Sequence, residues 1–121
     1  ARAVLPQRVP FADAVFNVSH AALLLRALET ADIDMIALAL DDRLHQPYRK
    51  GLIEGYDIAE QTAKSCGVRA FCISGAGPTC LCIADNDEVG ARLTEAVAAQ
   101  EALDGWQVLP LRVDTEGAKI L

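Results

Sequence analysis

Hydrophobic positions follow a helical period over much of the chain. From about Asp13 to Thr30, apolar residues recur every three or four positions with further apolar residues between them, which predicts a helix buried over much of its surface. A second helix is predicted to start with Asp32 as its N-cap and to continue through Leu44 until Pro47 stops it. Two more helices are expected, at about Leu52–Cys66, closed by Gly67, and from the Asp85–Asp87 turn through Leu103, closed by Gly105.

Two short apolar runs, Arg69–Ile73 and Cys80–Ala84, predict the strands of a hairpin. Helices interleaved with such a hairpin favour an α+β sandwich, in which helices pack on one face of a small antiparallel sheet. Short strands are also expected at both ends of the chain, from Ala1 to Leu5 and from about Trp106 to Val113, where Pro110 indicates an edge position or a bulge. No repeat or linker interrupts the pattern, so residues 1–121 are predicted to form a single domain.

The six residues between the two strand runs are hard to explain as packing alone. Glycine lets the main chain approach a ligand or another backbone closely, and the flanking hydroxyls can bond an anion or a neighbouring loop. An ordinary hairpin turn is the structural alternative, but its closing residues are usually Asn, Asp or Gly, and a proline removes a donor that a central strand needs. We therefore favour a functional role for this glycine-rich loop, which consists of Ser74, Gly75, Ala76, Gly77, Pro78 and Thr79.

Composition narrows the class of protein to which this loop belongs. Of the 121 residues, 52% are hydrophobic and 23% are charged, which is typical of one compact globular domain with its own core. The net charge of −6, without a Lys/Arg cluster, argues against a nucleic-acid or anionic-membrane surface. No signal peptide is recognised, and the apolar stretches are too interrupted by charge for a membrane span of roughly 20 residues. We therefore expect a small metabolite as the partner.

The cysteines fit neither a metal site nor a disulfide framework. They form no CxxC pair, and the two histidines lie far away in sequence. Free cysteine behaves as a small buried hydrophobe, which indicates core positions in a reducing cytoplasm. The four residues concerned are Cys66, Cys72, Cys80 and Cys82.

The run from Asp41 to Arg49 gathers polar and aromatic side chains around a predicted helix end. As a composition pattern, such a run is usually solvated. Arg49 differs, because a guanidinium just past a proline is aimed by a stiff backbone and can grip a carboxylate with two hydrogen bonds. Arg2 offers the same chemistry near the chain start. The spacing of residues assembles neither a Ser/His/Asp arrangement nor paired catalytic carboxylates, so these residues alone indicate a metabolite-binding α+β domain.

Four segments, in their order along the chain, resemble a known family. Together they are similar to the C-terminal half of the homoserine kinases, within the GHMP kinase superfamily, over essentially the whole chain. The glycine-rich loop resembles the superfamily's third motif, and the run ending at Arg49 is what points to the homoserine kinases. The segments are Ala1-Arg2 to Leu5-Pro6, Phe16-Asn17-Val18-Ser19, Asp42-Arg43-Leu44-His45-Gln46-Pro47-Tyr48-Arg49, and Phe71 to Thr79.

The resemblance implies a ferredoxin-like sandwich and ATP-dependent phosphorylation of the L-homoserine hydroxyl, with Mg²⁺ accompanying the nucleotide, on the route to threonine. In this family a second glycine/serine-rich motif in the N-terminal half cradles the ATP phosphates, and no segment here resembles it. We therefore expect this chain to be inactive alone and to act with its own N-terminal domain. The glycine-rich loop would then buttress the absent phosphate loop, with Ser74 and Thr79 contacting its backbone, and would be exposed, mobile and empty in this chain.

Residue by residue, Arg2 and Arg49 resemble the arginine pair that holds the carboxylate of the amino acid. His45, Tyr48 and Asn17 resemble residues that shape the site, whereas His20 stands where the family pattern has a larger basic residue. The resemblance implies no general base in this half, because phosphoryl transfer depends mainly on positioning and charge stabilisation. A homodimer is expected from the habit of the family.

Two alternatives stay open on the sequence. A different GHMP kinase, acting on mevalonate or a sugar, would share the glycine-rich loop but would have no use for two carboxylate-binding arginines. A non-catalytic, ferredoxin-like domain that binds an amino acid for regulation would also be small, acidic and α+β. Such a domain would bind its ligand alone, whereas half a kinase would not.

Overall fold

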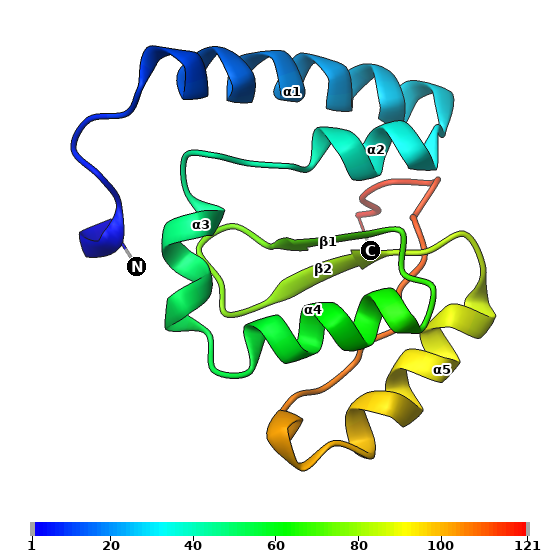
Figure 1. Ribbon diagram of the computed structural model, residues 1–121. Helices are drawn as coiled ribbons and strands as arrows, with labels where there is room; N and C mark the ends of the chain where they lie inside the picture. Colours follow the sequence, from blue (N-terminus) through cyan, green and yellow to red (C-terminus); the bar gives the residue numbers. More distant parts are fainter. Residues whose placement is uncertain (1, 121) are drawn as a thin grey trace.

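The computed structural model describes residues 2–120 of the chain. Within this range the chain forms a short antiparallel hairpin surrounded by helices (Figure 1). In chain order the elements are η1 (Arg2–Val4), α1 (Phe11–Thr30), α2 (Ile33–Ala39), α3 (Gln46–Arg49), η2 (Lys50–Leu52), α4 (Tyr56–Ser65), β1 (Ala70–Ile73), β2 (Cys80–Ile83), α5 (Asp87–Ala98) and η3 (Glu101–Leu103).

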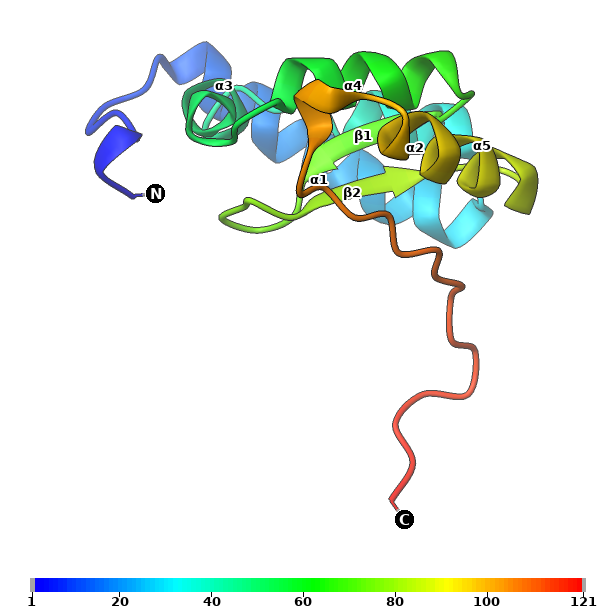
Figure 2. The ribbon, with the colours of Figure 1, turned by 90° about the horizontal axis from the view of Figure 1, so that it is seen from below.

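The predicted hairpin is confirmed. β1 and β2 pair antiparallel, with Phe71 opposite Cys82 and Ile73 opposite Cys80. Because side chains alternate along a strand, these positions share one face, and Phe71 and Ile73 pack there against Tyr56 at the start of α4. Figure 2 shows α4 lying across this face of the hairpin. The expected α+β class, with helices on a small antiparallel sheet, is therefore observed.

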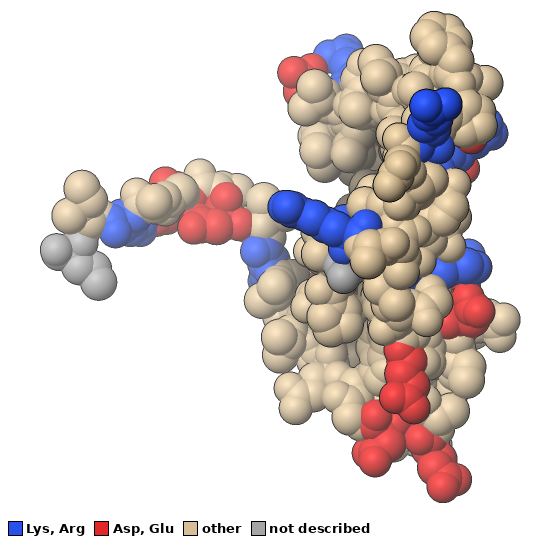
Figure 3. Space-filling model, turned by 90° about the vertical axis from the view of Figure 1, so that its left-hand side faces the viewer, with Lys and Arg blue, Asp and Glu red and all other residues tan. Residues whose placement is uncertain are grey.

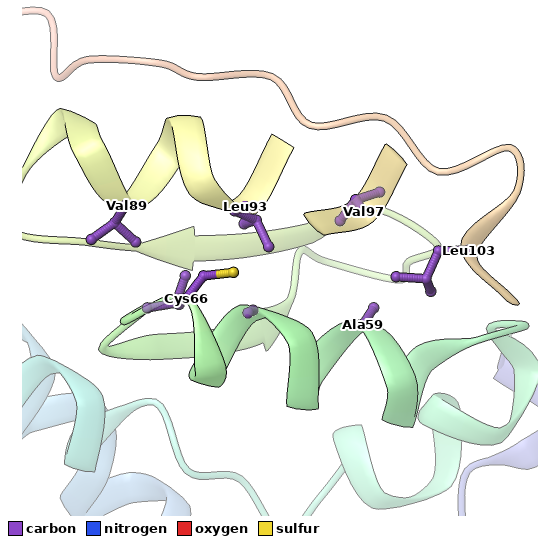
Figure 4. Close-up of a cluster of buried hydrophobic side chains, with 8 residues drawn as sticks. Ala59, Cys66, Val89, Leu93, Val97 and Leu103 are labelled. Atoms are coloured by element: carbon purple, nitrogen blue, oxygen red, sulfur yellow. The ribbon is translucent and has the colours of Figure 1, made fainter. Parts of the chain in front are cut away.

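Helices α4 and α5 meet over the hairpin in the main hydrophobic core (Figure 4). The stripe predicted on α4 is confirmed, because its apolar residues are buried at the spacing of one helical face. Gly67 follows α4 with a φ of +94°, the left-handed conformation expected of a residue that closes a helix. The buried members of the cluster are Ala59, Ala63, Cys66, Val68, Val89, Leu93, Val97 and Leu103.

Helices α1 and α2 form an antiparallel pair, and α2 packs beside β1 (Figure 1). The sequence predicts an α1 buried over much of its surface, and this is wrong. Only Ala27 on α1 is buried, whereas Phe11 is 85% and Val18 is 73% exposed. The reason is that α2 covers one side of α1 and leaves its outer apolar stripe open.

By length and composition alone, α1 is long and apolar enough to cross a membrane, whereas the sequence pattern predicts no membrane span. The helix also carries Asp13, Arg26 and Glu29, so its length and composition are weak support for a membrane span.

Three predicted helix boundaries are wrong. The second helix ends at Ala39, and Pro47 does not stop a helix but lies in the first turn of α3, where its missing N–H costs nothing. The third helix begins at Tyr56, after the 3-10 turn η2 and a turn at Gly55. The last helix starts as expected, with Asn86 as its N-cap, but ends at Ala98 before η3.

The two expected terminal strands do not form within the part of the chain that the structure describes. Residue 1 lies outside that part, and Arg2–Val4 is a 3-10 helix. The segment from Trp106 to Val113 has no regular structure; Trp106 and Val108 pack against the main core, and the chain beyond them leads away from the body (Figure 2). A strand needs a neighbour for its backbone groups, and neither segment lies in the two-stranded sheet.

The four cysteines are free thiols, as expected. Cys66 and Cys72 are buried, and burial raises the pKa of the Cys72 thiol above its ordinary value. Cys80 is half-buried, and burial first, with the neighbouring Cys72 and Glu60, raises its pKa to about 11. The raised pKa values keep the Cys72 and Cys80 thiols protonated and unreactive at neutral pH. Cys82 is exposed, so its predicted core position is wrong.

Candidate functional site

The loop between α2 and α3 is organised around one buried carboxylate, that of Asp42. Its side chain is 7% exposed. Asp42 Oδ2 accepts hydrogen bonds from the backbone N–H groups of His45 at 2.8 Å and Gln46 at 2.6 Å. Asp42 Oδ1 accepts a third from the Nδ2 amide of Asn17 on α1, at 2.5 Å. The carboxylate therefore joins the first turn of α3 to α1.

Hydrogen bonding keeps this carboxyl ionised in spite of its burial. Burial by itself raises the pKa of Asp42, but the N–H groups of Gln46 and His45, the Asn17 amide and the nearby His45 imidazole outweigh it, so the pKa lies below its ordinary value. A carboxyl whose folded pKa is lowered adds stability above its unfolded pKa, and this stability is lost as the pH falls through the folded pKa.

This shift predicts a pH-dependent effect of the Asp42→Asn substitution. The stability difference between the wild type and the variant should be full at neutral pH and should shrink as the pH falls below about 4, because the wild-type carboxyl is then protonated. Urea unfolding of both proteins from neutral to strongly acidic pH measures this difference. A difference that stays constant over that range would contradict the lowered pKa.

Gln46, which follows in the same run, connects α3 to the edge of β1. Its Oε1 accepts the N–H of Ile73 at 2.8 Å, and its Nε2 donates to the carbonyl of Leu40 at 3.1 Å. The bond to Ile73 occupies a backbone donor that points away from β2. Gln46 therefore fixes α3 against both the end of α2 and the hairpin.

Arg49 lies at the end of α3 and reaches the glycine-rich loop. Its Nη1 donates to the carbonyl of Gly75 at 2.8 Å. Its Nε is buried and has no hydrogen-bond partner among the described residues, and the same holds for Nδ1 of His45, four positions earlier. A buried polar atom without a partner is costly, so both atoms are candidates for a contact that the described residues do not supply.

The glycine-rich loop closes the hairpin at this end of the molecule. Ser74 N–H donates to Thr79 O at 2.9 Å, and Gly77 N–H donates to Ser74 O at 3.1 Å. Most of the loop is exposed, as the sequence led us to expect. Gly77 has a φ of +74°, and a Cβ there would lie 3.0 Å from Cδ1 of Ile53 and 3.2 Å from Cγ2 of Ile73. Gly77 is therefore required both by its backbone conformation and by packing.

Replacing Gly77 with alanine should destabilise the chain by about 1–2 kcal/mol from the left-handed backbone alone, with a further cost from the contact with Ile53. Gly75→Ala is the matched control, because Gly75 also has a positive φ, +61°, but nothing lies within 4 Å of its Cβ position. Urea unfolding of both variants measures the difference. Equal destabilisation by the two substitutions would show that packing at Gly77 contributes nothing.

The structure brings some of the predicted site residues together and leaves others apart. Asn17, His45 and Arg49 are connected through Asp42 and α3, and Arg49 reaches Gly75. Tyr48 is 40% exposed. Arg2 lies on η1, and within residues 2–120 its side chain and that of Arg49 share no hydrogen-bond partner. The structure therefore does not test the expected pairing of the two arginines.

Aromatic stacking continues the site along α1. The ring of His20 stacks on that of Phe16, with centroids 3.7 Å apart, and the guanidinium of Arg43 lies 3.7 Å from the Phe16 ring centroid. The backbone N–H of Arg43 also donates to Oδ1 of Asn17, at 2.9 Å. Figure 3, which views the end of the molecule at the left of Figure 1, shows Lys and Arg side chains across its middle and acidic side chains gathered below.

Sequence reasoning missed Asp42 and Gln46 as individual residues. A signal was present, because an acidic residue shortly before Gln46-Pro47 is typical of a helix start with proline in its first turn. Both residues also line an open groove of about 350 Å³ between α2, α3, α4 and β1. Five further charged residues line it as well: Asp41, Lys50, Glu60, Lys64 and Arg69.

The chain matches the family model described as GHMP kinases C terminal over residues 24–103. It therefore belongs to the GHMP kinase family and corresponds to its C-terminal domain. Within that family the chain is similar to homoserine kinases. It is 48% identical to the homoserine kinase of Nostoc punctiforme over 98% of this chain, and 51% identical to that of Thermosynechococcus vestitus over 96%.

A solved structure agrees with these sequence comparisons. The crystal structure of homoserine kinase from Cytophaga hutchinsonii superposes with a TM-score of 0.73 at 26% identity, covering 78% of this chain and 30% of that one. The chain spans 40% of the length of the Nostoc punctiforme relative and 36% of the Thermosynechococcus vestitus relative. The resemblance noted in the sequence is thus confirmed.

Proposed function

We propose that this chain is the C-terminal domain of a homoserine kinase, which transfers the γ-phosphate of ATP to the hydroxyl of L-homoserine to give O-phospho-L-homoserine. The observation that carries the proposal is the similarity to homoserine kinases over 98% of the chain. The product lies on the route to threonine, and we place the reaction in the cytoplasm.

In this proposal Arg49 binds the carboxylate of homoserine, with Arg2 as its partner. Arg49 uses one Nη1 hydrogen bond to hold the Gly75 carbonyl, and its buried Nε remains without a partner among residues 2–120. A planar guanidinium suits a carboxylate, since it can donate two parallel hydrogen bonds. Holding one end of homoserine places its hydroxyl for in-line attack on the γ-phosphate.

ATP and Mg²⁺ would be bound mainly outside this chain. In the described range, 2–120, no group of three or more His, Cys, Asp or Glu side chains is arranged to hold a metal ion, so we assign Mg²⁺ no ligand here. The exposed glycine-rich loop, Ser74 to Thr79, would support the phosphate-binding loop of the N-terminal domain through backbone and hydroxyl contacts. The magnesium ion would neutralise charge on the transferring phosphate.

Kinetic assays of the chain and of the full-length enzyme that contains it test this function. The full-length enzyme should phosphorylate homoserine in preference to mevalonate or a sugar, and a preference for either of these would favour another GHMP kinase. The isolated chain should fold but transfer no phosphate above a mock preparation. Calorimetry of the isolated chain with amino acids tests the remaining alternative, an amino-acid-binding regulatory domain. Tight binding without the other domain would favour that alternative.

A further inference from the structure

We infer that Asp42, held by Asn17, is the positioning residue that sets the orientation of Arg49 for substrate binding. This inference rests on the proposed function, in which Arg49 binds the substrate carboxylate. It concerns a different question, namely what keeps that guanidinium in place. The structure connects the three residues by a continuous path from α1 to α3.

The first part of the path concerns α3, which is too short to be stable by itself. Gln46–Arg49 is a helix of four residues, which has no stability in isolation because helix nucleation is unfavourable. Its first turn is fixed by Asp42 Oδ2, which accepts the N–H groups of His45 and Gln46. Its last residue, Arg49, is fixed at the far end by the Gly75 carbonyl. The direction of α3, and with it the position of Arg49, therefore depends on Asp42.

The second step is the connection of Asp42 to α1. Asp42 Oδ1 accepts from Asn17 Nδ2, while Asn17 Oδ1 accepts the backbone N–H of Arg43. Both atoms of the Asn17 amide are therefore used, which fixes its orientation. The Asn17 side chain cannot turn over without placing its NH₂ group against the N–H of Arg43. This leaves Asp42 one geometry in which all of its partners are satisfied.

The atom pattern predicts the effect of each single substitution. In Asp42→Asn, an amide that keeps its oxygen toward the two backbone N–H groups directs its NH₂ toward the NH₂ of Asn17, so two donors meet. In Asn17→Asp, two carboxylates face each other. Exchanging the two residues, Asn17→Asp with Asp42→Asn, restores every donor–acceptor pair and leaves the net charge unchanged.

Steady-state kinetics of the full-length enzyme tests the inference. Each single variant should raise the KM for homoserine roughly 10- to 100-fold, as expected for one hydrogen bond to a charged group, and change the KM for ATP less than about twofold. The exchange variant should return the KM for homoserine to within about threefold of the wild type. Asp41→Asn is the matched control, because exposed Asp41 accepts only the N–H of Asp42, a bond that asparagine can also make.

Two results would overturn the inference. One is a KM for homoserine that stays within about twofold of the wild type in both single variants. The other is an exchange variant that folds but keeps the raised KM, since a purely structural loss would not be tied to the donor–acceptor pattern. If Asp42→Asn does not fold, the exchange variant and Asn17→Ala still give the comparison. Arg49→Ala tests the proposed function separately, since an unchanged KM for homoserine there removes the role of Arg49 itself.

Discussion

Replacing Arg49 with alanine in the full-length enzyme is expected to weaken the use of homoserine by about 2–5 kcal/mol, measured as the loss in kcat/KM. The physical reason is that a carboxylate would enter a site whose charge-assisted hydrogen bonds are gone. The use of ATP should change far less, because the nucleotide is bound mainly by the other domain in our proposal.

The Arg49→Lys variant separates charge from geometry. An ammonium retains the positive charge but cannot donate two parallel hydrogen bonds, so lysine should restore the use of homoserine only in part. The planar guanidinium of Arg49 can donate to the Gly75 carbonyl and to a substrate carboxylate at the same time. The single ammonium group of lysine cannot reproduce both contacts in one plane. If Arg49→Ala used homoserine with the kinetics of the wild type, the proposed role of Arg49 in substrate binding would be wrong.

Replacing Leu103 with alanine is expected to lower the free energy of unfolding of the chain by about 2–5 kcal/mol. Leu103 is 2% exposed and lies on η3, where it closes the cluster between α4 and α5 (Figure 4). Truncation removes its contacts and leaves a cavity between elements that cannot fully collapse. Urea unfolding of the wild type and the variant measures the change.

Leu111→Ala is the matched control for this prediction. Leu111 is 87% exposed, on the segment that leads away from the body, so its truncation should change the stability by less than about 0.5 kcal/mol. Equal effects at the two positions would mean that the tail packs on the body in solution. A small effect at Leu103 alone would place the core elsewhere than between α4 and α5.

Local pattern was sufficient for the parts of the fold that are stabilised by near neighbours. The hairpin, the buried face of α4 and the Asn86 cap of α5 follow from alternation, helical spacing and turn chemistry. The position of α3 could not be predicted in this way. Pro47 is compatible with either the end or the beginning of a helix. A helix begins here because the buried carboxylate of Asp42 accepts the N–H of Gln46 in its first turn.

The sequence singled out Arg49 and the glycine-rich loop, but not Asp42 or Gln46, nor the connections between these residues. Arg49 and the glycine-rich loop are conspicuous by residue type, whereas their contact spans 26 positions of sequence. Asn17 and Asp42, 25 positions apart, meet only because α1 and α2 pack as a pair. Hydrogen bonds between distant segments depend on that packing, and no local spacing encodes them.

By itself, the sequence of this protein determined the α+β class, the hairpin with its glycine-rich loop, and the similarity to the GHMP kinases. The class and the hairpin rest on the backbone preferences and apolar spacing of neighbouring residues, whereas the similarity rests on the four segments that resemble the family. Only the tertiary structure decided that Asp42 joins α1 to α3 and that Arg49 grips the loop at Gly75. The physical reason is that a buried carboxylate takes whichever donors the packed helices bring to it.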